Sequence, residues 1–69
     1  LAFLDLHGRT AKYLDDRVKV NGTTTLATTH DEIAADLHTS RVVMSRILKQ
    51  LENEGKISLY RNRIEVLEF

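Results

Sequence analysis

The sequence lacks several features that would define other classes of protein. None of its 69 residues is cysteine, which excludes disulfide bonds, thiolate metal sites and a cysteine nucleophile. No apolar run is long enough to cross a membrane, and the N-terminus does not resemble a signal peptide. We therefore expect a soluble, cytoplasmic protein without a membrane partner. A chain of this length forms one small domain with a limited core.

The common catalytic patterns are missing as well. The sequence contains neither a nucleophile elbow nor a glycine-rich phosphate loop. His7, His30 and His38 have no cysteine to complete a zinc site, and histidines of this kind more often occupy solvent-exposed or turn positions. We expect no enzyme activity and no metal or cofactor within these residues.

The sequence has no excess of positive charge overall, because ten Lys and Arg residues match ten Asp and Glu residues. Their distribution is uneven. Residues 40–63 contain six basic and two acidic side chains, whereas acidic residues outnumber basic ones on either side of this segment. Binding to an anionic duplex depends on this local charge rather than on the total.

The most informative stretch is residues 29–55, THDEIAADLHTSRVVMSRILKQLENEG, which predicts two helices joined by a tight turn. Thr29 and Glu32 fit a capping box, in which the Thr29 hydroxyl accepts from the backbone N–H three residues on and Glu32 reaches back to the Thr29 amide. We expect His38, in the turn, to adopt the left-handed backbone region. Ser40 should cap the second helix, which Gly55 then ends.

The second helix has two different faces at about 100° per residue. The apolar face, which should pack on the core, consists of Met44, Ile47, Leu48 and Leu51. The opposite, largely cationic face consists of Arg41, Val42, Ser45, Arg46 and Lys49. Arginine can bond guanine O6 and N7 together, serine can bond a base or a phosphate, and valine can touch a thymine methyl group. The pattern predicts a helix-turn-helix with its second helix in the major groove.

The residues before this motif predict a helix followed by a hairpin. A helix capped by Asp5 should run to about Asp16, with one side formed by Leu6, Thr10, Tyr13 and Leu14. In residues 18–26, β-branched side chains flank Asn21 and Gly22, and this dipeptide favours a two-residue hairpin turn. A solvated loop is the alternative interpretation of this threonine-rich segment.

A second hairpin is predicted after Gly55, where apolar and polar residues alternate on both sides of the turn pair Arg61 and Asn62. A hairpin after such a helix is a wing. The predicted fold is therefore α+β: a winged helix-turn-helix, with a three-helix bundle against a small antiparallel sheet made of two hairpins. Arg61 and Arg63 at the wing tip are suited to contacting phosphate.

These residues resemble a known family. Residues 29–57, continuing into RNRIEV at 61–66, are similar to the DNA-binding domain of the Crp/Fnr (cyclic AMP receptor protein-like) transcription regulators. The most specific part is the S-R-x-x-x-S-R run with I-L-K-x-L-E-x-x-G behind it. The opening LAFLDLHGR resembles the junction at which the family's dimerisation helix ends. Residues 1–69 are thus expected to be the DNA-binding domain of a longer bacterial regulator.

The resemblance implies particular DNA contacts. Arg41 and Arg46 occupy positions at which the family contacts guanines, and Ser45 one at which it contacts the neighbouring base step. The predicted base-contacting residues are Arg41, Val42, Ser45 and Arg46. The predicted phosphate-contacting residues are Thr29, His30, Thr39, Ser40, Lys49, Arg61, Arg63 and His7.

The implied partners are a palindromic double-stranded operator, a second copy of the full-length protein in a homodimer, and RNA polymerase. A cyclic nucleotide or other signal would bind a separate N-terminal domain. Two residues depart from the family pattern: Val42 replaces a glutamate that accepts from cytosine, and His38 replaces a glycine. The stretch from Gly8 to Thr29 is also shorter than in a family member whose loop touches RNA polymerase, so activation through that contact does not follow.

A second interpretation is a winged helix that binds another protein. In this case the face from Arg41 to Lys49 would dock an acidic partner, and exposure of Val42 and Val43 would favour it. Salt dependence and preference among duplexes separate the two functions, because a DNA-binding protein loses affinity steeply with salt and prefers one duplex to scrambled competitors.

Overall fold

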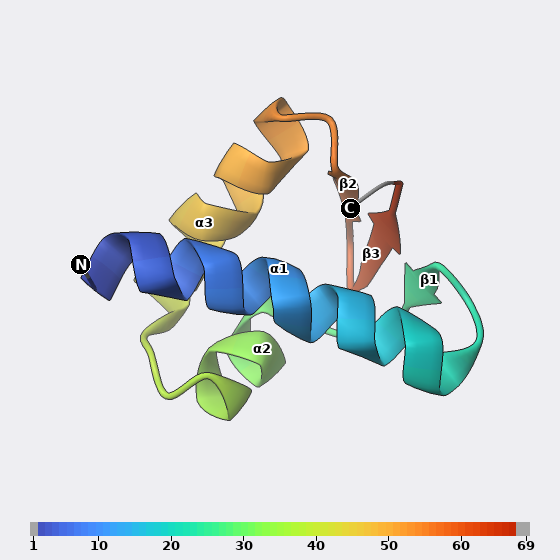
Figure 1. Cartoon of the computed structure of the whole chain (residues 1–69), viewed down its shortest axis with the longest axis horizontal. Helices are drawn as coiled ribbons and strands as arrows, with labels where there is room; N and C mark the ends of the chain where they lie inside the picture. The colour runs from blue at the N-terminus through green and yellow to red at the C-terminus, as the bar shows by residue number, and fades with distance from the viewer. Residues whose placement is uncertain (1, 68–69) are drawn as a thin grey trace.

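The computed structural model describes the backbone of residues 2–67 and the side chains of residues 6–67. Leu1 and residues 68–69 of the predicted domain lie outside this range. The elements, in chain order, are α1 (Ala2–Asn21), β1 (Thr25–Leu26), α2 (His30–Asp36), α3 (Arg41–Asn53), β2 (Ile57–Tyr60) and β3 (Arg63–Val66). Helix α1 passes across the molecule, with α2 and α3 against one half and the sheet beside the other (Figure 1). The predicted α+β winged-helix arrangement is confirmed.

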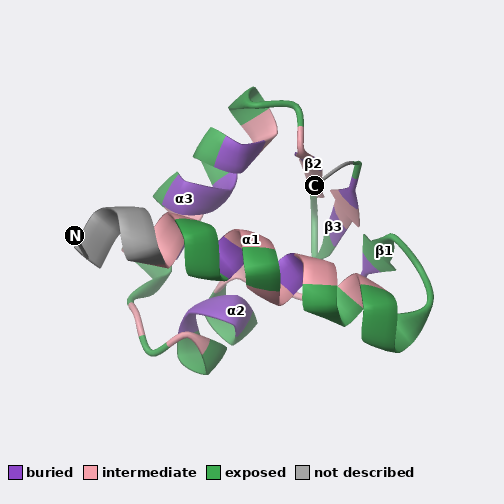
Figure 2. Ribbon diagram, in the orientation of Figure 1, coloured by how far each residue is buried: buried purple, intermediate pink, exposed green. Residues whose placement is uncertain are grey.

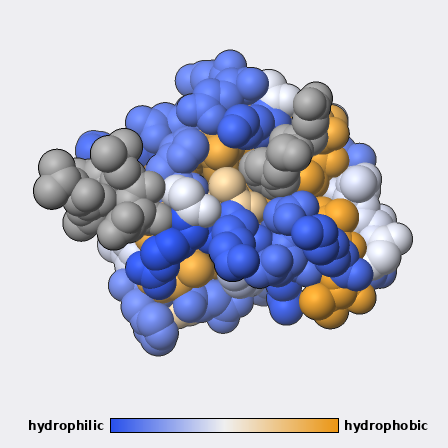
Figure 3. Space-filling model, in the orientation of Figure 1, coloured by the Kyte–Doolittle hydropathy of each residue, from blue (hydrophilic) through white to orange (hydrophobic). Residues whose placement is uncertain are grey.

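A single core lies where the three helices meet the sheet. The predicted apolar face of α3 is its centre, since Met44, Leu48 and Leu51 are completely buried and Ile47 is nearly so. The buried bands of the elements turn toward one another, while the exposed bands face outward (Figure 2). Hydrophilic side chains cover much of the face over α1 (Figure 3). Among the described residues, no helix has the length and apolar character needed to cross a bilayer.

Helix α1 is longer at both ends than the sequence predicts. It begins at Ala2, so Asp5 lies inside the helix instead of capping it. It continues to Asn21, and the predicted hairpin of residues 18–26 is wrong. Val18 packs against the core one turn after buried Leu14, and this tertiary packing outweighs the strand preference of valine.

The Asn-Gly pair that suggested a hairpin turn instead ends a helix. Gly22 has a φ of 70° and its N–H donates to the Val18 carbonyl at 2.8 Å, a helix-ending bond in the left-handed conformation that glycine adopts readily. Only Thr25 and Leu26 of the segment form a strand.

The sheet is therefore one hairpin with an added strand. Its order is β1-β3-β2, and both pairs are antiparallel, with Ile64 of β3 opposite Leu26 of β1 and Leu59 of β2. The wing hairpin, β2 to β3, is confirmed, and its turn contains Asn62 with a φ of 58°. On the β1 side, the hydroxyl groups of Thr24 and Thr25 both donate to the Glu65 carboxylate.

The predicted turn between α2 and α3 is confirmed. His38 has a φ of 57°, and the Ser40 hydroxyl accepts from the Val43 N–H at 3.2 Å. Gly55, with a φ of 79°, follows the end of α3. Histidine is the residue that takes the left-handed position, because a polar, unbranched side chain tolerates it better than most.

Half of the predicted capping box is present at α2. The Thr29 hydroxyl accepts from the Glu32 N–H at 3.2 Å. The other half is wrong, since the Glu32 carboxylate accepts from the Thr28 hydroxyl at 2.9 Å rather than from the Thr29 amide. Glu32 therefore ties down the loop that enters the helix.

Two glycines with opposite backbone requirements give a test of this fold. Gly8 lies inside α1, and among the described residues no atom would come within 4 Å of an added Cβ. Gly8→Ala should raise the free energy of unfolding by about 0.5–1 kcal/mol, because alanine favours a helix interior. Gly22→Ala should lower it by about 1–2 kcal/mol, because a Cβ disfavours positive φ. Urea denaturation followed by circular dichroism measures both, and equal signs would contradict the assigned helix end.

Candidate nucleic-acid interface

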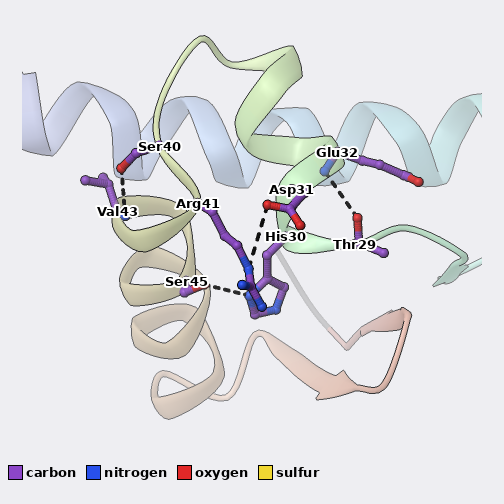
Figure 4. A network of polar contacts seen from close by, with 8 residues as sticks. All are labelled: Thr29, His30, Asp31, Glu32, Ser40, Arg41, Val43 and Ser45. Atoms are coloured by element: carbon purple, nitrogen blue, oxygen red, sulfur yellow. Dashed lines mark hydrogen bonds and ion pairs between the residues drawn. The ribbon is translucent and has the colours of Figure 1, made fainter.

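Three elements converge at one end of the molecule. The start of α2, the start of α3 and the wing tip surround a hollow of about 240 Å³. Its lining consists of Thr28, Thr29, His30, Asp31, Arg41, Tyr60 and Asn62. Figure 4 shows the α2 and α3 residues of this region side by side, joined by polar contacts. The predicted site residues Thr29, His30 and Arg41 are thus brought together although they are up to twelve positions apart in sequence.

The N-terminal half of α3 presents its cationic face outward. Arg41, Val42 and Arg46 are exposed, and Val42 retains 64% of its accessible surface. Ser40 caps the backbone N–H of Val43, so the positive end of the helix dipole lies beside these cations. A helix start of this kind favours an anionic partner.

Among the described residues, Arg41 pairs with Asp31 of α2. Its Nε lies 3.7 Å from Oδ1 of Asp31, and the two side chains are 70% and 72% exposed. A pair so accessible to water contributes roughly 0–1 kcal/mol and exchanges readily for another anion. Both residues line the hollow, and Figure 4 shows the Arg41 side chain beside the Asp31 carboxylate.

Ser45 is less open than its position on the helix suggested. It is half-buried, and its Oγ lies 2.9 Å from Nδ1 of His30, which is half-buried as well. This hydrogen bond joins the two helices of the motif. Sequence periodicity placed Ser45 on the cationic face of α3, but it gave no signal of a contact with His30.

Lys49 and Glu52 connect α3 to the wing. Lys49 Nζ is 3.0 Å from one Glu52 oxygen, and the other oxygen accepts the Leu59 N–H at 2.9 Å. The Leu59 N–H, and then the Lys49 ammonium, lower the pKa of Glu52 below its ordinary value. A glutamate on the helix thus fixes strand β2 and occupies a backbone donor on the free edge of the sheet.

The wing tip contains an aromatic residue that sequence reasoning missed. Tyr60 is 53% exposed, and the Arg63 guanidinium carbon lies 4.6 Å from the centre of its ring. This cation–π contact directs Arg63 along the wing, while Arg61 is exposed in the turn. The position of an aromatic residue immediately before the turn pair Arg61 and Asn62 could have indicated that Tyr60 lies at the wing tip.

Helix α2 is anchored to α1 on the side away from the hollow. The Tyr13 hydroxyl donates to the Asp36 carboxylate, and burial together with this bond raises the pKa of Tyr13 to about 12. The phenol therefore keeps its proton, and the donated bond, throughout the neutral range. This bond joins the end of α2 to α1, in addition to the burial of Ile33 and Ala34 in the core.

One predicted contact lies elsewhere. His7 Nε2 is 3.4 Å from Oε2 of Glu54, beyond the C-terminal end of α3. The 13 residues of α3, at about 1.5 Å each, separate this point from Arg41 by roughly 20 Å. Thr39 and Ser40, in contrast, lie at the start of α3 as predicted, Thr39 being half-buried and Ser40 exposed.

A helix-turn-helix followed by a β-hairpin, with a cationic second helix, defines a winged helix-turn-helix domain. The family described as the Crp-like helix-turn-helix domain matches residues 3–69, and the chain belongs to this family. No curated protein matches the chain.

Solved structures agree with this family. The chain is similar to the catabolite activator protein of Thermus thermophilus, with a TM-score of 0.90 and 32% identity over 99% of this chain and 32% of that one. It is also similar to a protein of Eubacterium rectale described as a transcriptional regulator of the crp/fnr family, with a TM-score of 0.88 and 35% identity over 91% of this chain and 29% of that one. The chain therefore spans about a third of the length of these relatives.

The Glu52 contact predicts an acid-dependent stability. Because folding lowers the pKa of Glu52 below its ordinary value of 4.5, its stabilisation is complete above that pH and is lost as the pH falls through the folded-state pKa. Glu52→Gln should lower the free energy of unfolding at neutral pH, with the difference closing in acid. Urea denaturation across this pH range measures it. Asp16→Asn, on exposed α1 surface, is the control and should show no such convergence.

Proposed function

We propose that this chain is the sequence-specific, double-stranded-DNA-binding domain of a bacterial transcription regulator. Helix α3 enters the major groove, and the wing and the helix starts contact the phosphate backbone. The observation that carries the proposal is the outward, uncovered position of the cationic face at the start of α3, where Arg41, Val42 and Arg46 are all exposed. Membership of the Crp-like helix-turn-helix family supports it.

The base contacts belong to one strip of α3. Ser45 lies four residues after Arg41 and three after Val42, and Arg46 lies four residues after Val42, so these residues share a face of the helix. Arg41 and Arg46 bond guanine O6 and N7, and Val42 packs against a thymine methyl group. Ser45, which is half-buried, contributes a hydroxyl group to this face. A hydrophobic residue at position 42 favours thymine where a glutamate would favour cytosine.

The phosphate contacts surround this strip. Thr29 and His30 at the start of α2, and Thr39 and Ser40 at the start of α3, approach the backbone beside the groove. Lys49 and the wing residues Arg61 and Arg63 approach it farther along the duplex. Contacts of this kind fix register and orientation without conferring sequence preference. His7 stays a prediction outside this surface, because the length of α3 separates it from the other residues.

In the full-length protein, two copies of this domain would bind DNA together as a homodimer. A domain with a single recognition helix contacts one half-site, and a homodimer would place a second helix about 34 Å along a palindromic operator. Linking two such domains raises the effective concentration of the second one, so the dimer binds far more tightly than one domain.

Exposed Val42, with half-buried Val43 beside it, is the observation that favours a protein partner instead. Selection from a pool of random duplexes, combined with a salt titration, distinguishes the two functions. We expect a single preferred half-site and an affinity that falls steeply with salt. Equal binding to all duplexes would overturn the proposal and support a protein-interaction module.

Arg46 and Lys49 provide a matched test of base and phosphate contacts. Arg46→Ala should cost about 1–3 kcal/mol on the selected duplex and relax preference at one base pair, because it removes a bidentate bond to guanine. Lys49→Ala should weaken selected and random duplexes alike and reduce the salt slope by about one. Fluorescence anisotropy on both duplexes measures these effects. Equal losses on the two duplexes for Arg46→Ala would remove its assignment as a base contact.

Asp31 is predicted to limit the affinity of the interface. Its carboxylate pairs with Arg41 and lines the same hollow, so it competes with phosphate. Asp31→Asn should increase affinity for all duplexes roughly two- to five-fold at low salt, the ratio equivalent to an exposed ion pair of ~0.5–1 kcal/mol. Asp16→Asn changes the total charge equally, but its position is outside the hollow, and it serves as the control. An equal gain for both variants would show a general charge effect.

A further inference from the structure

The hydrogen bond between His30 and Ser45 joins a residue of the first helix to a residue expected to contact a base. Nδ1 of His30 on α2 lies 2.9 Å from Oγ of Ser45 on α3, and both side chains are half-buried (Figure 4). His30 also lines the hollow beside the wing. If Ser45 contacts DNA, its hydroxyl group therefore already uses either its proton or one lone pair in the bond to His30.

A serine hydroxyl has one proton to donate and two lone pairs that accept. If Nδ1 of His30 carries no proton, Ser45 donates to it and offers only an acceptor to the duplex. The matching bases then present an amino group, as cytosine N4 and adenine N6 do. If Nδ1 carries a proton, Ser45 accepts from it, and the hydroxyl proton is free for guanine O6 or N7 or for thymine O4.

We propose that His30 is a positioning residue that determines which base Ser45 contacts, and that this preference changes with pH. The inference rests on the proposed DNA-binding function and names a residue that sets its specificity. A doubly protonated imidazole cannot accept a hydrogen bond at either nitrogen. Lower pH therefore removes the state in which Ser45 donates to His30, and it shifts preference toward bases that accept.

The charged and titratable groups near His30 come from α2, α3 and the wing. On α2, Asp31 follows it, and on α3, Arg41 pairs with that carboxylate at 3.7 Å, so their opposite charges offset each other. On the wing, Tyr60 lines the hollow and has Arg63 over its ring.

Duplex selection at about pH 5.5 and about pH 8, on either side of the range in which histidine ordinarily titrates, tests the inference. For the unaltered protein we expect preference at one base pair to move by about five-fold, the ratio that one hydrogen bond of ~1 kcal/mol gives. His30→Phe retains a ring without nitrogen, so preference there should be relaxed and equal at both pH values. His30→Asn retains a hydrogen-bonding group that does not titrate. The variant should therefore keep a base preference at this position, and that preference should be the same at both pH values.

Two controls show that the effect passes through this contact. His38→Asn removes a histidine from the turn while keeping a residue that tolerates positive φ, and it should retain the pH shift. In a Ser45→Ala protein, adding His30→Phe should not change base preference further.

Three results of this experiment have different consequences for DNA binding and for the role of His30. Absence of any preferred duplex for the unaltered protein would overturn DNA sequence recognition itself. A preferred duplex whose pH shift survives in His30→Phe would overturn only the assignment to His30. An equal loss of affinity for all duplexes, with base preference intact, would identify His30 as a simple phosphate contact and would also overturn the inference.

Discussion

The burial of one face of α3 is the constraint on which the rest of the structure depends. Met44, Leu48 and Leu51 are completely enclosed by the other helices and the sheet, which fixes the rotation of α3 about its own axis. The cationic residues occupy the opposite face, so they must point outward. Loss of one large side chain from a core this small costs ~2–5 kcal/mol. Packing thus determines which side of the helix an anionic duplex can approach.

Hydrogen bonds then set the other two elements of the interface relative to α3. Glu52 holds strand β2 through the Leu59 N–H, and His30 holds the start of α2 through Ser45. Both contacts involve a residue of α3, so the wing and α2 are both positioned relative to α3. Glu52 lies beside Lys49, and His30 lies beside Ser45, so each of these structural contacts adjoins a residue expected to touch DNA. A substitution at Glu52 or His30 is therefore expected to affect both the arrangement of the elements and the proposed DNA contacts.

The sequence predicted those features that depend on short spacings. Helix α3 and the left-handed turn at His38 follow from caps, periodicity and the absence of other turn residues, and the structure confirms them. The segment from Val18 to Asn21 was misassigned because its valines favour a strand locally, whereas packing next to Leu14 extends the helix. The His30 contact was not predictable, since the distance between two side chains on different helices depends on how those helices cross.

The neutral total charge of the chain is compatible with DNA binding because acidic residues stand beside the basic ones. Asp31 pairs with Arg41, and Glu52 with Lys49, so part of the positive field is cancelled before a duplex arrives. Non-specific binding arises almost entirely from that field and weakens when it is reduced. The base contacts proposed for Arg46 would depend on hydrogen-bond geometry rather than on that field. If these acidic partners lower the affinity for every duplex by a similar factor, the ratio between the preferred site and random DNA is set by the base contacts proposed for α3 and not by the field.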